Sequence, residues 1–262
     1  MDREALAAAV RRLEAPGFAG RMTALAGRPV EYMARLLPAP AAGVVARAAE
    51  SALTRALDIA LFSLRDHRLT GGRVVHSVLA SASGAVGGAF GIAALAIELP
   101  VSTAIMLRAI AAIAREEGED LADPRTALAC LEVFALGRSG TDTAEGIEGG
   151  YFAVRAVLAR GLAQAADVVV NKGTVHGGSA MAMRFLSPIV ARFGAVVSEK
   201  LAAQAVAVVG AVGGAVVNLA FIEHFQDLAR GHFTVRRLER AYGADAVHAE
   251  YDRLRSEVAA AA

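Results

Sequence analysis

A six-residue phrase occurs twice in this chain, each time within a long run that carries no charged residue. Gly-Ala-Val-Gly-Gly-Ala fills residues 84–89 and recurs unchanged at residues 210–215. The surrounding runs span 74–97 and 201–222 and consist mainly of Ala, Gly, Val and Leu. Segments this long and this apolar are typical of helices that are hidden from water on every side. The two runs therefore predict two central helices around which the rest of the chain must pack.

Each run also places small residues and one ionisable side chain on the same helical face. Residues three, four and seven apart are neighbours on a helix, and small residues spaced by four let two backbones approach closely. The face ends at Glu98 just after the first run and at His224 just after the second. The residues predicted to pack helices in this way are Gly84, Gly88, Gly91, Gly210 and Gly214.

Two interpretations of the repeat stay open at this stage. If the two runs pack around a pseudo-two-fold axis, Glu98 and His224 meet at one central site. Alternatively, the shared phrase reflects only the abundance of Gly, Ala and Val in both runs. The glycines serve close packing in either case.

The remaining chain is helix-forming almost throughout, with Ala, Leu, Arg and Glu dominant and no strand-like alternation. Asp2, Asp123 and Asp245 are expected N-caps, Pro100 an expected kink and Pro188 an expected break. The expected helices span 2–14, 41–64, 74–115, 123–137, 141–170, 179–200, 201–242 and 245 onward, with a broken stretch at 18–38 and an exposed loop at 171–178. Because no long linker divides these elements, we expect an all-α fold: one multi-helix bundle, residues 1–262, with two Gly/Ala-rich central helices.

The same runs raise the question of a membrane. The second run reaches the length of about 20 residues that a spanning helix requires. Its Gly and Ala content, with Gln204 and Asn218, is close to neutral for insertion, however. We therefore expect buried core helices, with shallow or conditional membrane insertion as the alternative.

Composition narrows the class of partner and the compartment. Net charge is +1, aromatic residues make up 5% and Trp is absent, so nucleic acid is not an expected partner. Cys130 is the only cysteine, which favours a reducing compartment, and residues 1–5 do not resemble a secretory signal. We expect a cytoplasmic protein.

The polar residues of the apolar helices are the candidates for chemistry. Phosphate-loop, dinucleotide-binding, nucleophile-elbow and Glu-x-x-His patterns are missing from the sequence. His224 and Asp227 share a helical face, and with Glu98 they would offer ligands that zinc or iron accepts. The alternative is a buried hydrogen-bonded network, and no cofactor is predicted beyond this divalent-metal option. The candidate catalytic residues are Glu98, Glu132, His224, Asp227 and His232.

Four arginines follow the second run. Basic residues directly after an apolar segment favour anionic lipid head groups. The alternative is a solvated face with Arg–Glu pairs, for instance with Glu239. The predicted lipid- or anion-binding residues are Arg230, Arg236, Arg237 and Arg240.

Several longer phrases resemble the EcsC protein family over about residues 75–252, whereas residues 1–70 are less distinctive. The phrases are Ala96 to Thr103 with Met106-Leu107-Arg108, Cys130 to Gly137, Arg192-Phe193-Gly194 with Val197 to Lys200, and Asn218 to Phe233 with Arg236 to Glu239. The resemblance carries over no catalytic residue. It implies a setting beside a membrane exporter, and hence a link to membrane or transport processes.

Together these observations predict a non-catalytic helical protein, associated peripherally with the inner face of the membrane, whose partner is lipid or a membrane protein such as a transporter. The alternative is a metal-binding protein or hydrolase-type enzyme that uses Glu98, His224 and Asp227. A purely structural scaffold is the third possibility.

Overall fold

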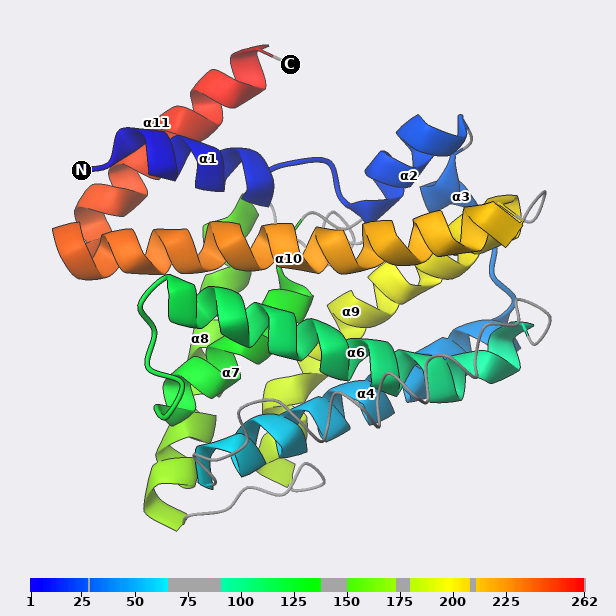
Figure 1. The fold of residues 1–262 in the computed structure, drawn as a ribbon, viewed down its shortest axis with the longest axis horizontal. Helices are drawn as coiled ribbons and strands as arrows, with labels where there is room; N and C mark the ends of the chain where they lie inside the picture. Colours follow the sequence, from blue (N-terminus) through cyan, green and yellow to red (C-terminus); the bar gives the residue numbers. More distant parts are fainter. Residues whose placement is uncertain (28, 66–90, 138–149, 173–179, 208–210, 262) are drawn as a thin grey trace.

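The computed structural model describes residues 1–27, 29–65, 91–137, 150–172, 180–207 and 211–261 (Figure 1). Regular structure in this part of the chain is helical and includes no strand, which confirms the predicted all-α class. The α-helices are α1 (Arg3–Leu13), α2 (Phe18–Ala26), α3 (Val30–Arg35), α4 (Ala39–Arg65), α6 (Gly91–Glu116), α7 (Pro124–Glu132), α8 (Gly150–Lys172), α9 (Ala180–Ala207), α10 (Ala211–Tyr242) and α11 (Ala244–Ala261), with a 3-10 turn η1 (Val133–Ala135) after α7.

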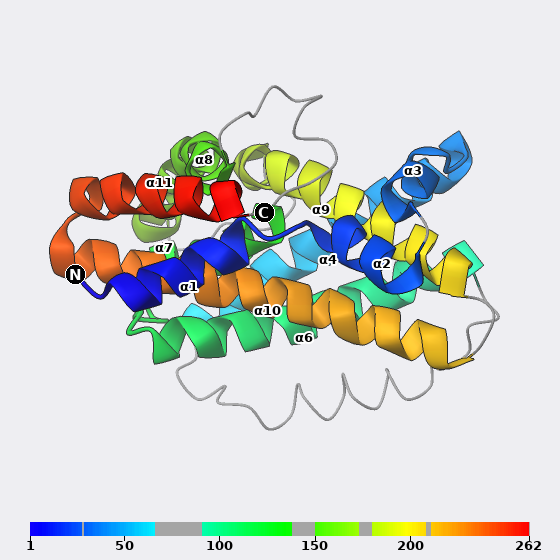
Figure 2. The same cartoon turned by 90° about the horizontal axis from the view of Figure 1, so that it is seen from above.

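The longest helix, α10, crosses the whole molecule and has 32 residues. Helix α6 lies beside it and runs in the same direction, with α4 beyond α6 (Figures 1 and 2). Helices α1 and α11 cover the second half of α10. Helices α2 and α3, the end of α9 and the beginnings of α6 and α10 gather at the opposite end in both views. The two ends of α10 thus lie in different surroundings.

Capping residues set the helix boundaries where the sequence predicted them. The Asp2 side chain accepts a hydrogen bond from the Ala5 amide at 3.0 Å, and Asp123 accepts one from the Arg125 amide at 2.8 Å. Gly243 ends α10 in the left-handed region at φ +87°, which only glycine adopts without strain. Asp245, in contrast, lies inside the first turn of α11, which begins at Ala244, so it is not the cap.

Two long segments differ from the sequence prediction. Helix α9 continues through Pro188 without a break, although the proline lacks a backbone donor, and its neighbours Phe185, Leu186 and Ile189 are buried. The second uncharged run is not one helix: it is shared between the end of α9 and the beginning of α10, which point in different directions. The expectation of one helix over 201–242 was therefore wrong, whereas Val217, Phe221, His224 and Leu228 do share a buried face of α10.

The glycines predicted to pack helices fall largely outside the described part of the chain. Gly84, Gly88 and Gly210 lie outside the described residues, and only the helical backbone is described at Gly91 and Gly214. A different glycine is needed for close packing: a Cβ at Gly231 of α10 would lie 2.7 Å from Leu13 Cγ of α1. No local pattern predicts this contact, because Leu13 lies more than 200 residues before Gly231 in the chain.

The central apolar residues form one buried cluster that extends from α1 to α11. Phenylalanines from α2, η1, α9 and α10 meet in its middle, with ring centroids 5.1 Å apart for Phe134 and Phe193 and 5.2 Å apart for Phe221 and Phe225. Within the described residues, one stretch of helix, Leu95–Glu116, is long and apolar enough to cross a membrane, and half of it is buried inside the protein. A core helix meets the same criterion, so this finding alone does not distinguish the two.

Candidate functional site

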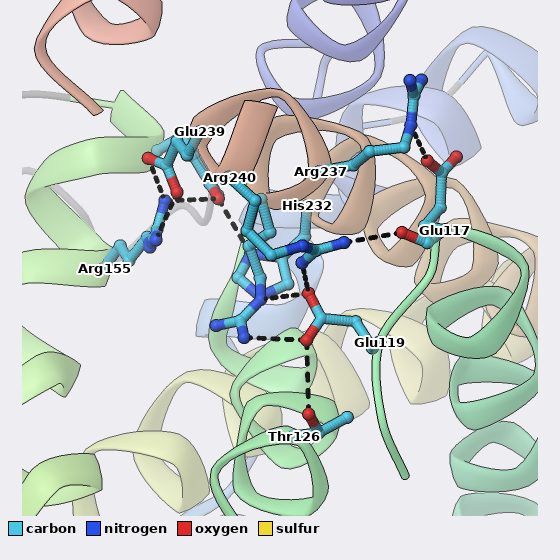
Figure 3. A network of polar contacts seen from close by, with 10 residues as sticks. Glu117, Glu119, Thr126, Arg155, His232, Arg237, Glu239 and Arg240 are labelled. Atoms are coloured by element: carbon cyan, nitrogen blue, oxygen red, sulfur yellow. Dashed lines mark hydrogen bonds and ion pairs between the residues drawn. The ribbon is translucent and has the colours of Figure 1, made fainter. Parts of the chain in front are cut away.

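The end of α10 that carries the predicted lipid-binding arginines is a network of ion pairs (Figure 3). Glu119, in the link between α6 and α7, accepts hydrogen bonds from Arg236 Nε at 2.8 Å and Arg236 Nη2 at 3.0 Å. Arg240 also pairs with Glu119, and Arg237 Nε donates to Glu117 Oε2 at 2.6 Å. We call this region, together with Arg155, Glu239 and the residues they contact, the charged end.

These contacts change the interpretation of the basic cluster. Arg236, Arg237 and Arg240 attach the α6–α7 link to α10, and Arg230 lies 3.7 Å from Asp227. Glu239, the partner that the sequence suggested, instead accepts hydrogen bonds from both Nη atoms of Arg155 on α8, each at 2.7 Å. The positive charges are therefore matched within the protein, and this geometry does not support their prediction as lipid contacts.

Two aromatic side chains continue the network into the interior. Tyr151 Oη lies 2.8 Å from His232 Nδ1, and Arg155 Nη1 donates to the same hydroxyl at 3.4 Å. A hydroxyl donates one hydrogen bond and can accept two, so the Tyr151–His232 contact forms with either tautomer of His232 and leaves Nε2 as the other ring nitrogen. That Nε2 is buried and has no hydrogen-bond partner. Burial, reinforced by Arg155 and Arg236, holds the pKa of His232 well below its usual value, so the ring is neutral.

Glu132, at the end of α7, is an ionisable group in the same interior region. Its side chain is buried, and burial raises its pKa from 4.5 to about 7, against the opposing pull of Arg155 and Arg236. Both guanidinium groups already have carboxylate partners. Glu132 can therefore gain or lose a proton near neutral pH. Of the five candidate catalytic residues, the structure brings Glu132 and His232 into one electrostatic neighbourhood.

At the other end of α10, Glu98 has an unpredicted partner. Lys200 of α9 donates from Nζ to Glu98 Oε1 at 2.6 Å, and Nζ also lies 4.8 Å from the centroid of Phe221. The Lys200 side chain is 1% exposed, against 35% for Glu98. No hydrogen bond or ion pair joins Glu98 to His224, although both are described. The predicted meeting of these two residues is therefore replaced by an ion pair with a third helix.

His224 and Asp227 likewise have separate surroundings. The His224 ring is buried beside Phe18 and Phe225, and its Nδ1 has no hydrogen-bond partner. Burial, followed by the charge of Arg21, lowers its pKa from 6.5 to about 3. Asp227 pairs with Arg21 at 3.1 Å. Within the described residues no group of three or more His, Cys, Asp and Glu side chains could hold a metal ion. The predicted Glu98, His224 and Asp227 metal site is therefore not formed by this geometry.

The end of the molecule that contains Lys200 exposes large apolar side chains. Ile97 of α6 is 70% exposed and Leu219 of α10 is 57% exposed, at the beginnings of two neighbouring parallel helices. Helices α2 and α3 contribute further exposed side chains at the same end. We call this part of the molecule the apolar end; its exposed large apolar residues are Leu25, Tyr32, Leu36, Ile97, Val216 and Leu219.

Sequence reasoning missed Lys200, Arg155, Tyr151 and Glu119. Lys200 directly precedes the second uncharged run, and this position suggests that its ammonium group is buried. The sequence does not identify its partner, because Glu98 lies on another helix. Glu117 and Glu119 belong to an acidic stretch that looks like a solvated turn. Their pairing with arginines of α10 arises only when α6 and α10 lie side by side.

The fold and these two ends define a helical-bundle protein with a long central helix, one ion-paired end and one apolar end. The model of the EcsC protein family matches residues 63–238, and the chain belongs to this family. The match includes both uncharged runs, the α6–α7 link and nearly all of α10. No curated protein and no solved structure matches the chain.

Proposed function

We propose that this EcsC-family protein is a non-catalytic protein that binds membranes peripherally through its apolar end. The observation that carries the proposal is the gathering of exposed large apolar side chains at the beginnings of α6 and α10, beside α2 and α3. Large exposed apolar patches are typical of surfaces that bind a membrane or another protein. A soluble domain that needed no partner would gain little by leaving these side chains in water.

The sequence around the apolar end favours lipid as the partner. Both uncharged runs lead into it: the first ends at Ile97, and the second includes Val216 and Leu219. Their small and apolar residues insert into the boundary between head groups and acyl chains at little cost. Attachment to the inner face of the membrane, and a transporter as neighbour, belong to the same proposal and rest on the single cysteine and on the family resemblance.

The alternative enzyme or metal-binding function gains less support. Its three central residues contact different groups. Glu98 pairs with Lys200, Asp227 pairs with Arg21, and His224 packs against aromatic rings. Glu132 and His232 do lie in one electrostatic neighbourhood, but the described residues around them contain no activated nucleophile. We therefore place the membrane-binding proposal first.

Flotation with phosphatidylcholine vesicles tests the proposal, using Leu219→Glu against Val157→Glu. The two side chains are matched, because Leu219 is 57% exposed at the apolar end and Val157 is 55% exposed on α8. A buried carboxylate in the bilayer is costly, so Leu219→Glu should abolish flotation while Val157→Glu leaves it unchanged.

Two results would overturn the proposal. One is equal flotation of the two variants, or none of the unmodified protein. The other is a stable dimer in light scattering that Leu219→Glu dissociates, which would assign the apolar end to a second copy of the chain.

A further inference from the structure

The ammonium group of Lys200 is a buried cation directly behind the apolar end. Its side chain is 1% exposed, and its counter-ion is Glu98 at 2.6 Å. One face of the ammonium lies over the Phe221 ring, 4.8 Å from the centroid. An ammonium has three N–H donors, and among the described residues only Glu98 accepts a hydrogen bond from it. Two of its N–H donors therefore have no acceptor among the described residues, in a buried place where an uncompensated charge is costly.

The two members of this pair differ in freedom. Lys200 is enclosed, whereas Glu98 is 35% exposed and directly follows Ile97, which is 70% exposed. The carboxylate therefore stands at the rim of the apolar end, and the ammonium stands beneath it. The Glu98 side chain already reaches water, whereas the Lys200 side chain is enclosed by the protein.

Asn218 adds a second polar group without a partner. Its Oδ1 is buried and accepts no hydrogen bond. It precedes Phe221 by three residues on α10, so it lies on the same helical face, one turn nearer the apolar end. An amide also carries two N–H donors beside its oxygen, and a phosphate oxygen can accept from these. An acceptor-rich ligand beside Phe221 would thus meet both ammonium and amide donors.

We infer that Lys200, assisted by Asn218, binds the phosphate of an anionic lipid when the apolar end meets the bilayer, and that Glu98 is the counter-ion that this phosphate replaces. The inference rests on the proposed membrane binding. An anionic surface repels the Glu98 carboxylate and supplies phosphate oxygens at the same depth. The exchange leaves the buried ammonium paired throughout and needs no covalent step.

Flotation with two vesicle compositions separates this inference from the proposed function. Binding to pure phosphatidylcholine reports insertion of the apolar end, and the extra binding to vesicles containing phosphatidylglycerol reports the phosphate site. Lys200→Met should keep the first and lower the second about fivefold, the effect of one basic residue near a lipid surface. Glu98→Gln leaves the ammonium without its carboxylate and should increase the preference for phosphatidylglycerol.

A matched charge control is Arg35→Gln, which removes one positive charge from an exposed pair with Glu31 at the apolar end. Its effect should disappear in 0.5 M salt, roughly where the screening length falls below 5 Å, whereas the effect of Lys200→Met should persist because its pair is buried. Inorganic phosphate, added at equal ionic strength, identifies the source of the anion. Competition by millimolar phosphate would assign the site to the free ion and overturn the lipid assignment.

The inference fails if folded Lys200→Met keeps the full preference for phosphatidylglycerol, or if Glu98→Gln lowers it. Circular dichroism establishes folding, and if Lys200→Met does not fold, the Glu98→Gln result decides. If the unmodified protein does not bind phosphatidylcholine vesicles, the proposed function itself is wrong.

Discussion

The two ends of α10 differ in whether their side chains find partners within the chain. At the charged end, carboxylates of the α6–α7 link and of α10 itself meet guanidinium groups in close, often bidentate pairs. At the apolar end, one ion pair, Lys200 with Glu98, lies behind exposed hydrophobic side chains. The charged end is complete within the chain, whereas the apolar end exposes groups that water does not favour. The contrast agrees with our proposal that the first end stabilises the fold and the second binds a partner.

The largest effect is expected at the charged end, from Glu119→Ala. The Glu119 side chain is only 5% exposed and pairs with Arg236 and Arg240, while Thr126 donates to it at 3.2 Å. Removing one partner of a buried ion pair leaves the other charge uncompensated, so we expect a loss of about 3–5 kcal/mol in the free energy of unfolding. Urea denaturation measures it.

The control for Glu119→Ala is Glu31→Ala, which breaks the exposed pair with Arg35 on α3. Exposed pairs of this kind contribute about 0–1 kcal/mol. Equal losses in the two variants would mean that the charged end is no more than a solvated surface, and the contrast between the ends would disappear.

The second prediction concerns pH dependence at the charged end. The folded-state pKa of Glu132, about 7, lies above its usual 4.5. A raised pKa of an acid gives stability that is complete below about pH 4.5 and is lost as the pH rises through about 7. The full difference corresponds to roughly 3 kcal/mol, most of it lost between pH 5 and pH 8. In Glu132→Gln this loss should be missing, as urea denaturation at the two pH values would show.

His224, nearer the apolar end, should give the free energy of unfolding the opposite dependence on pH. Its folded-state pKa, about 3, lies below its usual 6.5. A lowered pKa of a base gives stability that is complete above about pH 6.5 and is lost as the pH falls towards 3. About 2 kcal/mol should be lost between pH 7 and pH 5. His224→Phe, placed among Phe18 and Phe225, should abolish this loss; an unchanged acid limb would show that His224 is not the group concerned.

These opposite slopes have a consequence for the unmodified protein. Between pH 5 and pH 8 the contributions of Glu132 and His224 largely cancel, since one falls as the other rises. His232, whose pKa is also lowered by burial, adds to the acid-side loss. The unmodified chain should therefore lose stability mainly on the acid side, and the single variants separate the contributions of Glu132 and His224.

Much of the fold could be predicted from local signals. Asp2 and Asp123 cap helices because their carboxylates reach free amides within one turn, and Gly243 ends α10 because it alone adopts a positive φ freely. The exposed stripe of α4, which includes Arg47 and Arg55, also follows from helical spacing. Each of these features depends on residues no more than a few turns apart.

The candidate site could not be predicted in the same way, because its contacts join distant helices. Helical spacing placed Glu98 and His224 at the same position of two matching faces. It gave no indication that Lys200, from a third helix, would pair with Glu98. The arginines of α10 were assigned to lipid or to Glu239, whereas Glu119 lies 117 residues from Arg236 along the chain. Charge and spacing identify which groups need partners; only the packing of α6 against α10 decides which partners they obtain.

The smallest expected effect tests how complete the charged end is. Tyr151→Phe removes the hydroxyl that shares a hydrogen bond with His232 Nδ1 and leaves both ring nitrogens of His232 without partners. His232 would then resemble His224, whose Nδ1 is already unpaired in an aromatic environment. A buried polar group left without its hydrogen-bond partner costs about 1–3 kcal/mol, which urea denaturation at pH 8 measures while both imidazoles are neutral. An unchanged free energy of unfolding would show that the interior of the charged end is as tolerant of unpaired groups as the surroundings of His224.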